Sequence, residues 1–440
     1  MIKKVLLVYC NLPKEPLLPL SIGYLTAVLK ELGVEVDLFD TTYYTKEDCN
    51  DQIAREESGQ VETTIDYIRG RPYKYIWEDF VGRLNLFDPE LVAFTCTEAT
   101  HKIMEELVEY VPNKIKVVVG GPFATFYPQY FIEQVLADYV CIGDGEKVIR
   151  DIICGNKLYA NNKICYDFVE NLEDLPIPDF SLFPEDRWLR PMSGKLYKMV
   201  PIEISRGCLF ACSYCSAPSY RKLFRGWHRL RSAYDIVEEM NTYKIVDKVE
   251  YFYLISESFG TDDVWLCDFM ERYSNVGLPF WFNTRPEVIN KMHIEELRGL
   301  KDVGCHRISM GVEHGNEEFR KGMLNRKYSN EDVLKAVYKI NNAGIELSVN
   351  NMIGFPDETE ELLRNTIAIN RMIKADSHTV SVFQPYRGTK LYQHCIDNNY
   401  FPEWSVCGEQ FNESVLDMPE PYLSSKMIEE YYFKFNNLIK

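Results

Sequence analysis

Short β-rich runs, each ending in small or polar residues and followed by helix-spaced apolar positions, recur along this chain of 440 residues. In its N-terminal part these runs occupy residues 2–10, 34–39, 91–96, 116–119 and 139–142. Continuous apolar runs of this kind predict a parallel sheet that is buried on both faces. We therefore expect residues 1–165 to form a doubly wound, Rossmann-like α/β domain, with a ligand site at the carboxyl ends of its strands.

A second series of strand and helix patterns begins near residue 199. The predicted strands are 199–205, 249–255, 279–283, 306–311, 345–352 and 380–384, and the helices between them are 232–243, 262–273, 293–303, 330–343 and 358–373. Successive βα units of this length predict a partial (β/α)6 barrel over residues 199–390, with its chemistry at the carboxyl ends of the strands.

The rest of the chain is less regular. Four prolines punctuate residues 166–198, which we interpret as a linker between the two domains. Residues 391–440 form a C-terminal extension without a motif, and residues 43–85 are acidic and tyrosine-rich, with no pattern that assigns them to an element.

Charge and hydropathy exclude several classes of protein. With 66 acidic against 49 basic residues, the net charge of −17 disfavours nucleic-acid binding by phosphate neutralisation. No run of about 18 apolar residues is long enough to span a bilayer. The apolar stretch at residues 5–9 is too short for a signal peptide. We expect a cytoplasmic protein without a membrane partner.

Three cysteines in one short segment carry the strongest chemical signal. Cys208, Cys212 and Cys215 form a C-x3-C-x2-C run directly after the first predicted barrel strand. Three thiolates this close can bind three corners of a cubane iron–sulfur cluster and leave one iron open. A tetrahedral zinc site usually takes a fourth protein ligand, and the nearest histidine, His228, is thirteen residues beyond Cys215, so zinc is only a weak alternative.

The cysteine run and several later segments resemble the radical S-adenosylmethionine (SAM) superfamily. The later segments are the G-x-E-x-G sequence at 311–315, the arginine-bearing turn at 324–326, the glycine- and proline-containing segment at 351–356 and the P-x-x-G-T sequence at 385–389. The resemblance implies a 4Fe–4S cluster on the three cysteines, and SAM bound to the open iron. The residues that it assigns to SAM are Tyr214, Glu257, Asn283, Glu313, Arg326, Gly354 and Pro356.

The N-terminal domain resembles the cobalamin-binding domain that precedes one large radical SAM subclass. The resemblance rests on residues 16–25, 119–128 and 138–146, in which small residues follow the strands and leave room for a corrin. The residues assigned to cobalamin are Leu18, Thr95, Thr97, Glu98, Gly120, Gly121, Pro122, Gly143, Gly145 and Glu146. The D-x-H-x-x-G sequence of classical cobalamin domains is absent, and His101 is the domain's single histidine. We expect cobalt without a histidine ligand.

These resemblances imply a cobalamin-dependent class B radical SAM methyltransferase. In the implied mechanism one SAM methylates reduced cobalt, and a second SAM is cleaved to a 5′-deoxyadenosyl radical that activates an unactivated carbon of a small-molecule or natural-product substrate. An external reductant of flavodoxin or ferredoxin type would supply the electron. The catalytic residues and the substrate cannot be assigned from the sequence.

Several alternatives remain open. The same cofactors could serve a radical cyclisation, ring contraction or rearrangement, and a cluster and corrinoid could instead act as a sensor. Cys10, Cys49 and Cys96 suggest a tRNA methylthiotransferase, but Gly120-Gly121-Pro122 stands where that family has a cysteine, and a basic RNA-binding module is missing. The basic run at residues 221–231 could hold an anionic group, although a solvated patch is the simpler interpretation.

Overall fold

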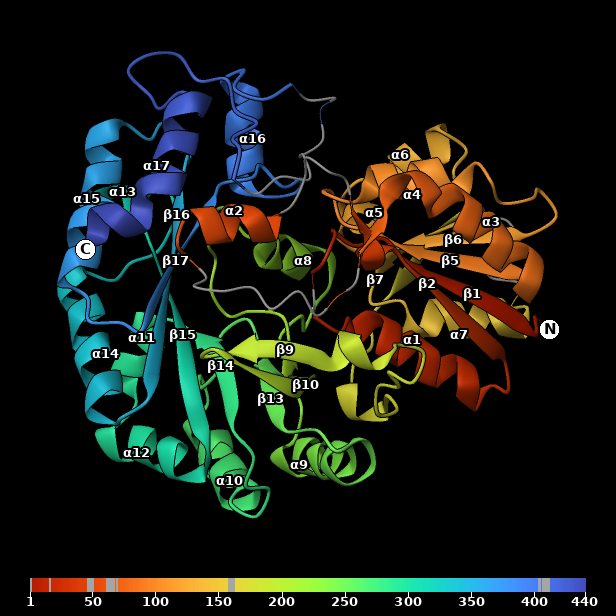
Figure 1. Ribbon diagram of the computed structural model, residues 1–440, viewed down its shortest axis with the longest axis horizontal. Helices are drawn as coiled ribbons and strands as arrows, with labels where there is room; N and C mark the ends of the chain where they lie inside the picture. Colours follow the sequence, from red (N-terminus) through yellow and green to blue (C-terminus); the bar gives the residue numbers. More distant parts are fainter. Residues whose placement is uncertain are drawn as a thin grey trace. The chain divides into compact units, whose positions relative to one another are not determined.

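The computed structural model describes residues 2–15, 17–45, 51–60, 68, 70–156, 163–402, 405 and 412–440. The chain divides into two compact units (Figure 1). Unit 1 comprises Met1–Gln52, Asp66–Arg190 and Val406–Gln410, and unit 2 comprises Ile53–Ile65, Pro191–Ser405 and Phe411–Lys440. No helix in the described part of the chain combines the length and the apolar character needed to cross a membrane.

Unit 1 is built on a six-stranded sheet with the order β2-β1-β5-β6-β7-β8. Its strands are β1 (Lys4–Tyr9), β2 (Glu35–Asp40), β5 (Leu91–Thr95), β6 (Lys116–Gly120), β7 (Tyr139–Gly143) and β8 (Ile164–Asp167). All neighbouring strands pair in parallel. The chain adds strands on one side of β1 first and then, from β5 onward, on the other side, so the switch point lies between β1 and β5. Doubly wound folds bind ligands at this point, beside the loops at the carboxyl ends of the two strands.

Helices cover both faces of this sheet. Side chains of α3 (Ile76–Phe87), α4 (His101–Val108), α5 (Pro122–Phe126) and α6 (Pro128–Glu133) share one apolar core with the strands. Helices α1 (Leu20–Glu31) and α7 (Glu146–Cys154) pack against each other. Short elements complete the unit: η1 (Thr41–Tyr43), β3 (Tyr44–Thr45), β4 (Arg71–Pro72), η2 (Tyr73–Tyr75), η4 (Leu172–Asp174) and η5 (Glu185–Trp188).

Unit 2 is a curled sheet with the order β17-β16-β15-β14-β13-β10-β9. Its strands are β9 (Leu189–Met192), β10 (Lys195–Glu203), β13 (Tyr251–Ile255), β14 (Phe280–Thr284), β15 (Cys305–Glu313), β16 (Glu346–Ile353) and β17 (Ser377–Val382). Neighbouring strands from β10 to β17 pair in parallel. Together with unit 1 this confirms the predicted fold class, a Rossmann-like sheet followed by a partial (β/α)6 barrel.

The helices of unit 2 follow the strands as βα units. They are α8 (Ala217–Leu223), α9 (Ala233–Thr242), α10 (Asp263–Tyr273), α11 (Pro286–Lys291), α12 (Ile294–Val303), α13 (Glu317–Gly322), α14 (Asn330–Asn342), α15 (Glu360–Met372), α16 (Lys390–Asp397) and α17 (Ser425–Ile439). Two small elements accompany them: the pair β11 (Ser205–Arg206) and β12 (Arg229–Leu230), and the π-helix η6 (Tyr243–Asp247).

Burial distinguishes the two faces of the barrel sheet. Apolar residues such as Phe252, Phe282 and Val349 are fully buried on the outer face, which α9, α10, α12 and α14 cover (Figure 1). The alternate residues face the barrel interior, and many of these are polar and only partly buried, for example Asn350 and Thr379. The partly open interior face is where a barrel of this kind accepts a ligand.

Two stretches differ from their sequence-based interpretation. The proposed linker 166–198 contains β9 and the start of β10, which pairs with β13 some fifty residues later along the chain. The unassigned region supplies α2 (Asp51–Glu57), and its Ala54 belongs to the apolar core of unit 2. Gln60 Oε1 accepts a hydrogen bond at 3.0 Å from the backbone N–H of Val380 on the edge strand β17. Periodicity could not reveal either contact, because both join residues far apart in sequence.

Candidate active site

The three-cysteine loop follows β11 and is held in place from both sides. The backbone N–H of Ser213 donates to the carbonyl of Leu324 at 3.1 Å, and the carbonyl of Ser213 accepts from the backbone N–H of Leu391 at 3.1 Å. Asn325 Nδ2 donates to the carbonyl of Ala211 at 2.7 Å. These bonds fix the path of the loop through the turn at 324–326, which the sequence pattern singled out, and through Leu391, two residues beyond the P-x-x-G-T segment at 385–389.

Gly207 sets the entry into the loop. Its φ of 92° lies in the left-handed region, and an added Cβ would stand 2.2 Å from the carbonyl oxygen of Trp227. Only glycine permits this close approach, because it has no Cβ. The backbone N–H of Gly207 donates to Glu257 Oε1 at 3.2 Å. The carboxylate of Glu257 therefore lies at the start of the cysteine loop, at the carboxyl end of β13.

The thiols of Cys208, Cys212 and Cys215 lie close enough to influence one another electrostatically. Burial raises the pKa of Cys215 to about 11 and also raises the pKa of Cys208. In the described residues, no three His, Cys, Asp or Glu side chains form a group that could hold one metal ion. A cubane cluster does not need such a group, since each cysteine binds a different iron. The loop fits a cluster, whose bound form would deprotonate these thiols.

Three of the predicted SAM residues form one hydrogen-bonded network beside the loop. Arg326 Nη1 donates to Glu313 Oε1 at 2.5 Å and to the Tyr214 hydroxyl at 2.6 Å. Arg326 Nη2 donates to the carbonyl of Gly311 at 3.0 Å. The guanidinium is 3% exposed, and these partners fix its orientation. The structure thus brings Tyr214, from the cysteine loop, together with Glu313 at a strand end and Arg326 in a turn, which are about a hundred residues later in the sequence.

The G-x-E-x-G segment owes its two glycines to close packing. A Cβ at Gly311 would lie 2.3 Å from Glu313 Oε1, and a Cβ at Gly315 would lie 2.2 Å from the carbonyl oxygen of Asn365 on α15. Glu313 itself has a φ of 63°, which turns the chain at the end of β15. The glycines therefore make room for the carboxylate and for the neighbouring helix.

The segment Gly354–Phe355–Pro356 ends β16 and is held by one carboxylate. Glu358 Oε2 accepts from the backbone N–H groups of Gly354 at 2.6 Å and Phe355 at 3.0 Å. Its other oxygen lies 3.3 Å from His314 Nε2, and both side chains are fully buried. No sequence motif indicates Glu358, because its partners are two backbone N–H groups and His314, which is 44 residues earlier in the chain.

Asn283, also assigned to SAM, faces the barrel interior from β14. Its Nδ2 donates to the Tyr253 hydroxyl at 2.6 Å, and the Tyr253 ring stacks on Trp281 with centroids 3.9 Å apart. Glu257 follows the adjacent strand β13, and desolvation by the surrounding protein raises its pKa to about 7. Both residues therefore lie at the same strand ends as the cysteine loop.

The basic run at residues 221–231 is solvated in its first half and structural in its second: Arg221, Lys222 and Arg225 are exposed, whereas Arg229 and Arg231 are buried. Arg221 donates to the carbonyls of Leu209 and Phe210 in the cysteine loop. Arg231 is 4% exposed and pairs with Asp235 and Glu239. These arginines brace the loop and its neighbouring helix.

In unit 1, the predicted cobalamin residues gather at the carboxyl ends of β5, β6 and β7. Gly121, Gly143 and Gly145 have φ values of 100°, 106° and 114°. A Cβ at Gly121 would lie 2.5 Å from the carbonyl oxygen of Cys96, so the turn after β6 lies directly on the neighbouring strand end. A Cβ at Gly120 or Gly145 would meet only Cys141 atoms within 4 Å. The backbone there leaves room for a large ligand to approach.

The remaining predicted residues of this edge differ in burial: Thr97 and Pro122 are exposed and Thr95 is partly buried, whereas Leu18, Glu98 and Glu146 are buried. Thr95 is the last residue of β5, and Pro122 is the first residue of α5. Thr97 follows β5, and its backbone N–H donates to Thr100 Oγ1. Leu18 is 2% exposed, and Glu98 and Glu146 are each 5% exposed. The side chain of Leu18, in the loop before α1, is therefore part of the buried core.

Two polar residues that position this edge were not anticipated. Asp167 Oδ2 accepts from the backbone N–H groups of Gly145, Lys147 and Val148 at 2.7–3.0 Å and so caps the N-terminus of α7. Arg187 is 1% exposed, pairs with Asp40 at 2.8 Å and donates to the carbonyl of Glu15 in the loop after β1. Both act across long sequence separations, which leaves no local pattern.

His101 is buried in the aromatic core and does not lie on the surface. Its Nδ1 lies 2.7 Å from the carbonyl of Glu98, and its ring meets Phe123 and Tyr130 edge-to-face. Its position favours packing over a metal-ligand role. Cys10 and Cys96 are also buried core residues, whereas Cys49 and Cys407 lie outside the described residues.

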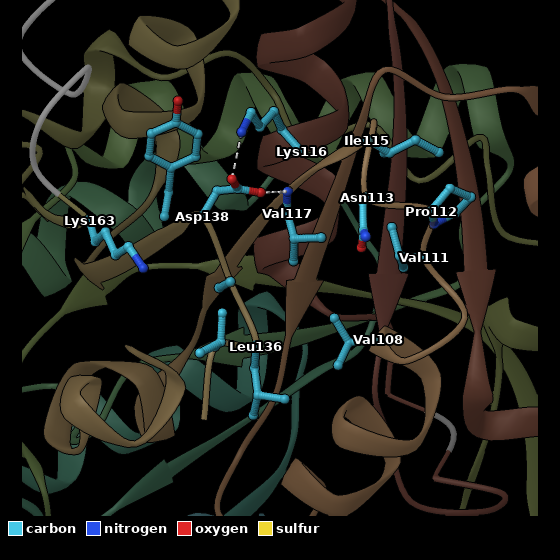
Figure 2. A pocket seen from close by; sticks show the side chains of 13 residues that line it. Val108, Val111, Pro112, Asn113, Ile115, Lys116, Val117, Leu136, Asp138 and Lys163 are labelled. Carbon is cyan, nitrogen blue, oxygen red and sulfur yellow. Dashed lines mark hydrogen bonds and ion pairs between the residues drawn. The ribbon is translucent and has the colours of Figure 1, made fainter. Parts of the chain in front are cut away.

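A pocket of about 530 Å³ lies at the other end of the unit 1 sheet (Figure 2). It is lined at the amino ends of β6 and β7 by residues that include Val111, Ile115 and Lys163. Asp138 ties its wall together through an ion pair with Lys116 and a bond from the Val117 N–H, shown as dashed lines in Figure 2. This pocket is separate from the glycine-lined strand ends.

Two family models match the two units. The radical SAM superfamily model matches residues 202–368, and the B12 binding domain model matches residues 8–153. An uncharacterized methyltransferase of Pyrococcus horikoshii is 24% identical over 77% of this chain and 76% of its own length. A putative methylthiotransferase of Methanocaldococcus jannaschii is 26% identical over 69% of each protein.

The solved structures that align with the whole chain include a methyltransferase and the cobalamin-dependent S-adenosylmethionine radical enzyme OxsB, which has a TM-score of 0.63 at 16% identity over 100% of this chain and 56% of that one. The methyltransferase is TsrM from Kitasatospora setae, a radical S-adenosylmethionine methyltransferase with cobalamin and a 4Fe–4S cluster bound. The TM-score is 0.64 at 17% identity, over 100% of this chain and 89% of that one. At this identity the likeness concerns the fold.

Proposed function

Because the chain belongs to the radical SAM superfamily and carries an N-terminal B12-binding domain, we propose that it is a cobalamin-dependent radical SAM enzyme that methylates an unactivated carbon. The observation that carries this proposal is the cysteine loop with the Arg326–Glu313–Tyr214 network at the same strand ends. The glycine-lined strand ends of unit 1 support the corrinoid part of the proposal, since their backbone leaves a ligand room to approach.

The proposal gives each group of residues a role. Cys208, Cys212 and Cys215 would hold the 4Fe–4S cluster. The cluster and cobalamin, when bound, would supply the electron for SAM cleavage and the methyl carrier. Arg326, already oriented by Glu313, would offer a buried positive charge and Tyr214 its ring to SAM. Gly354 and Pro356 would form a wall whose shape Glu358 maintains.

The interior face of the barrel suggests where a small-molecule substrate would bind. It carries uncharged hydrogen-bonding groups: Asn350 Nδ2 donates to Ser309 Oγ at 2.9 Å, and Thr379 Oγ1 donates to Asn350 Oδ1 at 2.8 Å. The stacked Tyr253 and Trp281 add a flat apolar surface. This wall suits a neutral ring compound with polar substituents. We propose further that a ferredoxin- or flavodoxin-type donor reduces the cluster and that the protein works in the cytoplasm.

Anaerobic reconstitution tests the proposal. We expect the protein to take up about four irons, to show a corrinoid absorbance when purified with cobalamin, and to release 5′-deoxyadenosine from SAM on reduction. A Cys208→Ala, Cys212→Ala, Cys215→Ala variant should lose the iron and the SAM cleavage. Cys267→Ala, which changes an exposed cysteine of α10, should keep both.

Two results would contradict the proposal. If the triple variant keeps the cluster and still cleaves SAM, the three cysteines do not hold the cluster. If the product does not gain the mass of one methylene, the reaction is a radical rearrangement or cyclisation and not a methylation.

A further inference from the structure

Arg285 makes a contact with the cysteine loop that no sequence motif indicated. It follows β14 directly, and its Nη1 donates a hydrogen bond to Cys212 Sγ at 3.0 Å. The guanidinium also lies over the ring of Phe210, 3.8 Å from its centroid. Arg285 is only 6% exposed, so its charge is poorly screened by water. A buried cation therefore lies directly on the sulfur of a proposed cluster ligand.

One carboxylate balances this cation on the side away from the sulfur. Glu287 accepts two bonds from Arg285, at 2.7 Å from Nη2 and at 3.3 Å from Nε. The guanidinium therefore presents the edge formed by Nε and Nη2 to Glu287 and its remaining nitrogen, Nη1, to Cys212. Because its donors are already committed in this way, it is poorly placed to bind the charged end of a substrate. Its position favours an effect on the sulfur that it contacts.

Hydrogen bonds to cluster sulfurs and the local net charge are the main means by which proteins set cluster potentials. Reduction of the cluster by one electron from a ferredoxin- or flavodoxin-type donor adds one negative charge beside Arg285. A fixed cation stabilises that reduced form and so raises the reduction potential. Glu287 opposes this effect because it lies on the same guanidinium.

We propose that Arg285 is a positioning residue that raises the reduction potential of the cluster through its bond to Cys212, and that Glu287 limits this effect. The inference rests on the proposed cluster at Cys208, Cys212 and Cys215. It concerns a property of the cluster itself and needs no knowledge of the substrate.

The test is a redox titration of the anaerobically reconstituted full-length protein, followed by electron paramagnetic resonance, with iron and sulfide measured in each sample. Arg285→Met keeps the length of the side chain but removes the charge and the donor. We expect it to lower the ratio of reduced to oxidised cluster at a fixed potential by roughly tenfold, which is about 59 mV for one electron. Glu287→Gln leaves the cation unbalanced and should shift the potential in the opposite direction.

Arg307→Met is the matched control. Arg307 also pairs with a glutamate inside unit 2, Glu346 at 2.6 Å, but it lies near the amino end of β15, away from the cysteine loop. Its replacement should leave the potential unchanged. If Arg285→Met fails to take up iron, Glu287→Gln decides the question alone, because it leaves every loop contact in place.

The outcomes separate this inference from the proposed function. Fully loaded Arg285→Met and Glu287→Gln variants with the wild-type potential would overturn the role of Arg285 and leave the cluster assignment intact. A wild-type protein that takes up no cluster would overturn both.

Discussion

Gly207→Ala should displace the cysteine loop, and the structure offers a matched comparison in Gly226→Ala. Both glycines have left-handed φ values, 92° and 70°. An alanine at such a position costs about 1–2 kcal/mol. At Gly226 the new methyl meets nothing within 4 Å, whereas at Gly207 it meets the carbonyl oxygen of Trp227 at 2.2 Å and Cδ1 of the same residue at 2.5 Å.

The difference between the two variants isolates the collision. A backbone carbonyl cannot rotate away as a side chain can, and overpacking of this kind adds about 1–3 kcal/mol. We therefore expect Gly207→Ala to lower the free energy of unfolding by about 2–5 kcal/mol, and Gly226→Ala to lower it by about 1–2 kcal/mol. Because Gly207 precedes Cys208, the backbone shift that relieves the collision should also move a cluster ligand.

Urea unfolding and iron content measure the two consequences. The stability difference is read from the midpoints of the same transition, provided that the slope m is unchanged. Gly226→Ala should take up the wild-type amount of iron on anaerobic reconstitution, and Gly207→Ala substantially less. Equal midpoints and equal iron contents for the two variants would refute the reasoning, since the close approach to Trp227 would then have no consequence.

Two further predictions concern other parts of the chain. Gly121→Ala should weaken cobalamin retention, measured by corrinoid absorbance after gel filtration, because its methyl collides with the carbonyl oxygen of Cys96; Gly155→Ala, at an open left-handed position, should not. Burial raises the pKa of Glu239 to about 7 in spite of its pair with Arg231, so its contribution to stability is present below pH 4.5 and is lost as the pH rises through 7. When the midpoint of urea unfolding is plotted against pH, Glu239→Gln should reduce the fall between pH 4.5 and 7. The same fall in the variant as in the wild type would show that Glu239 does not cause it.

The sequence predicted those features that depend on local pattern. Parallel strands buried on both faces show as apolar runs, and β1, β5 and β15 lie within a few residues of their predicted places. The cysteine loop is a contiguous motif. Glu313 and Arg326 were singled out because each belongs to a short segment that resembles a known family, but their ion pair is visible only in the structure.

The features that sequence reasoning missed depend on contacts between distant segments. Arg285 stands between a threonine and a proline in a strand end, and nothing nearby shows that it reaches Cys212, 73 residues earlier. Asp167 serves as a helix cap from another strand, so it leaves no capping pattern beside α7. Strand β10 begins at Lys195, four residues before the start at Met199 that the sequence predicts, because two of its first four residues are lysines and interrupt the apolar run.

The division of the chain into units matters for anyone who wishes to exchange or truncate its domains. Residues 53–65 belong to unit 2 although they interrupt the sequence of unit 1, and Gln60 supplies the acceptor for an edge N–H of β17. A fragment that begins at residue 191 would lack this strand cap and would also lose Ala54 from its core. The two halves are therefore not interchangeable cassettes, and a chimera must carry residues 53–65 together with the barrel to which they belong.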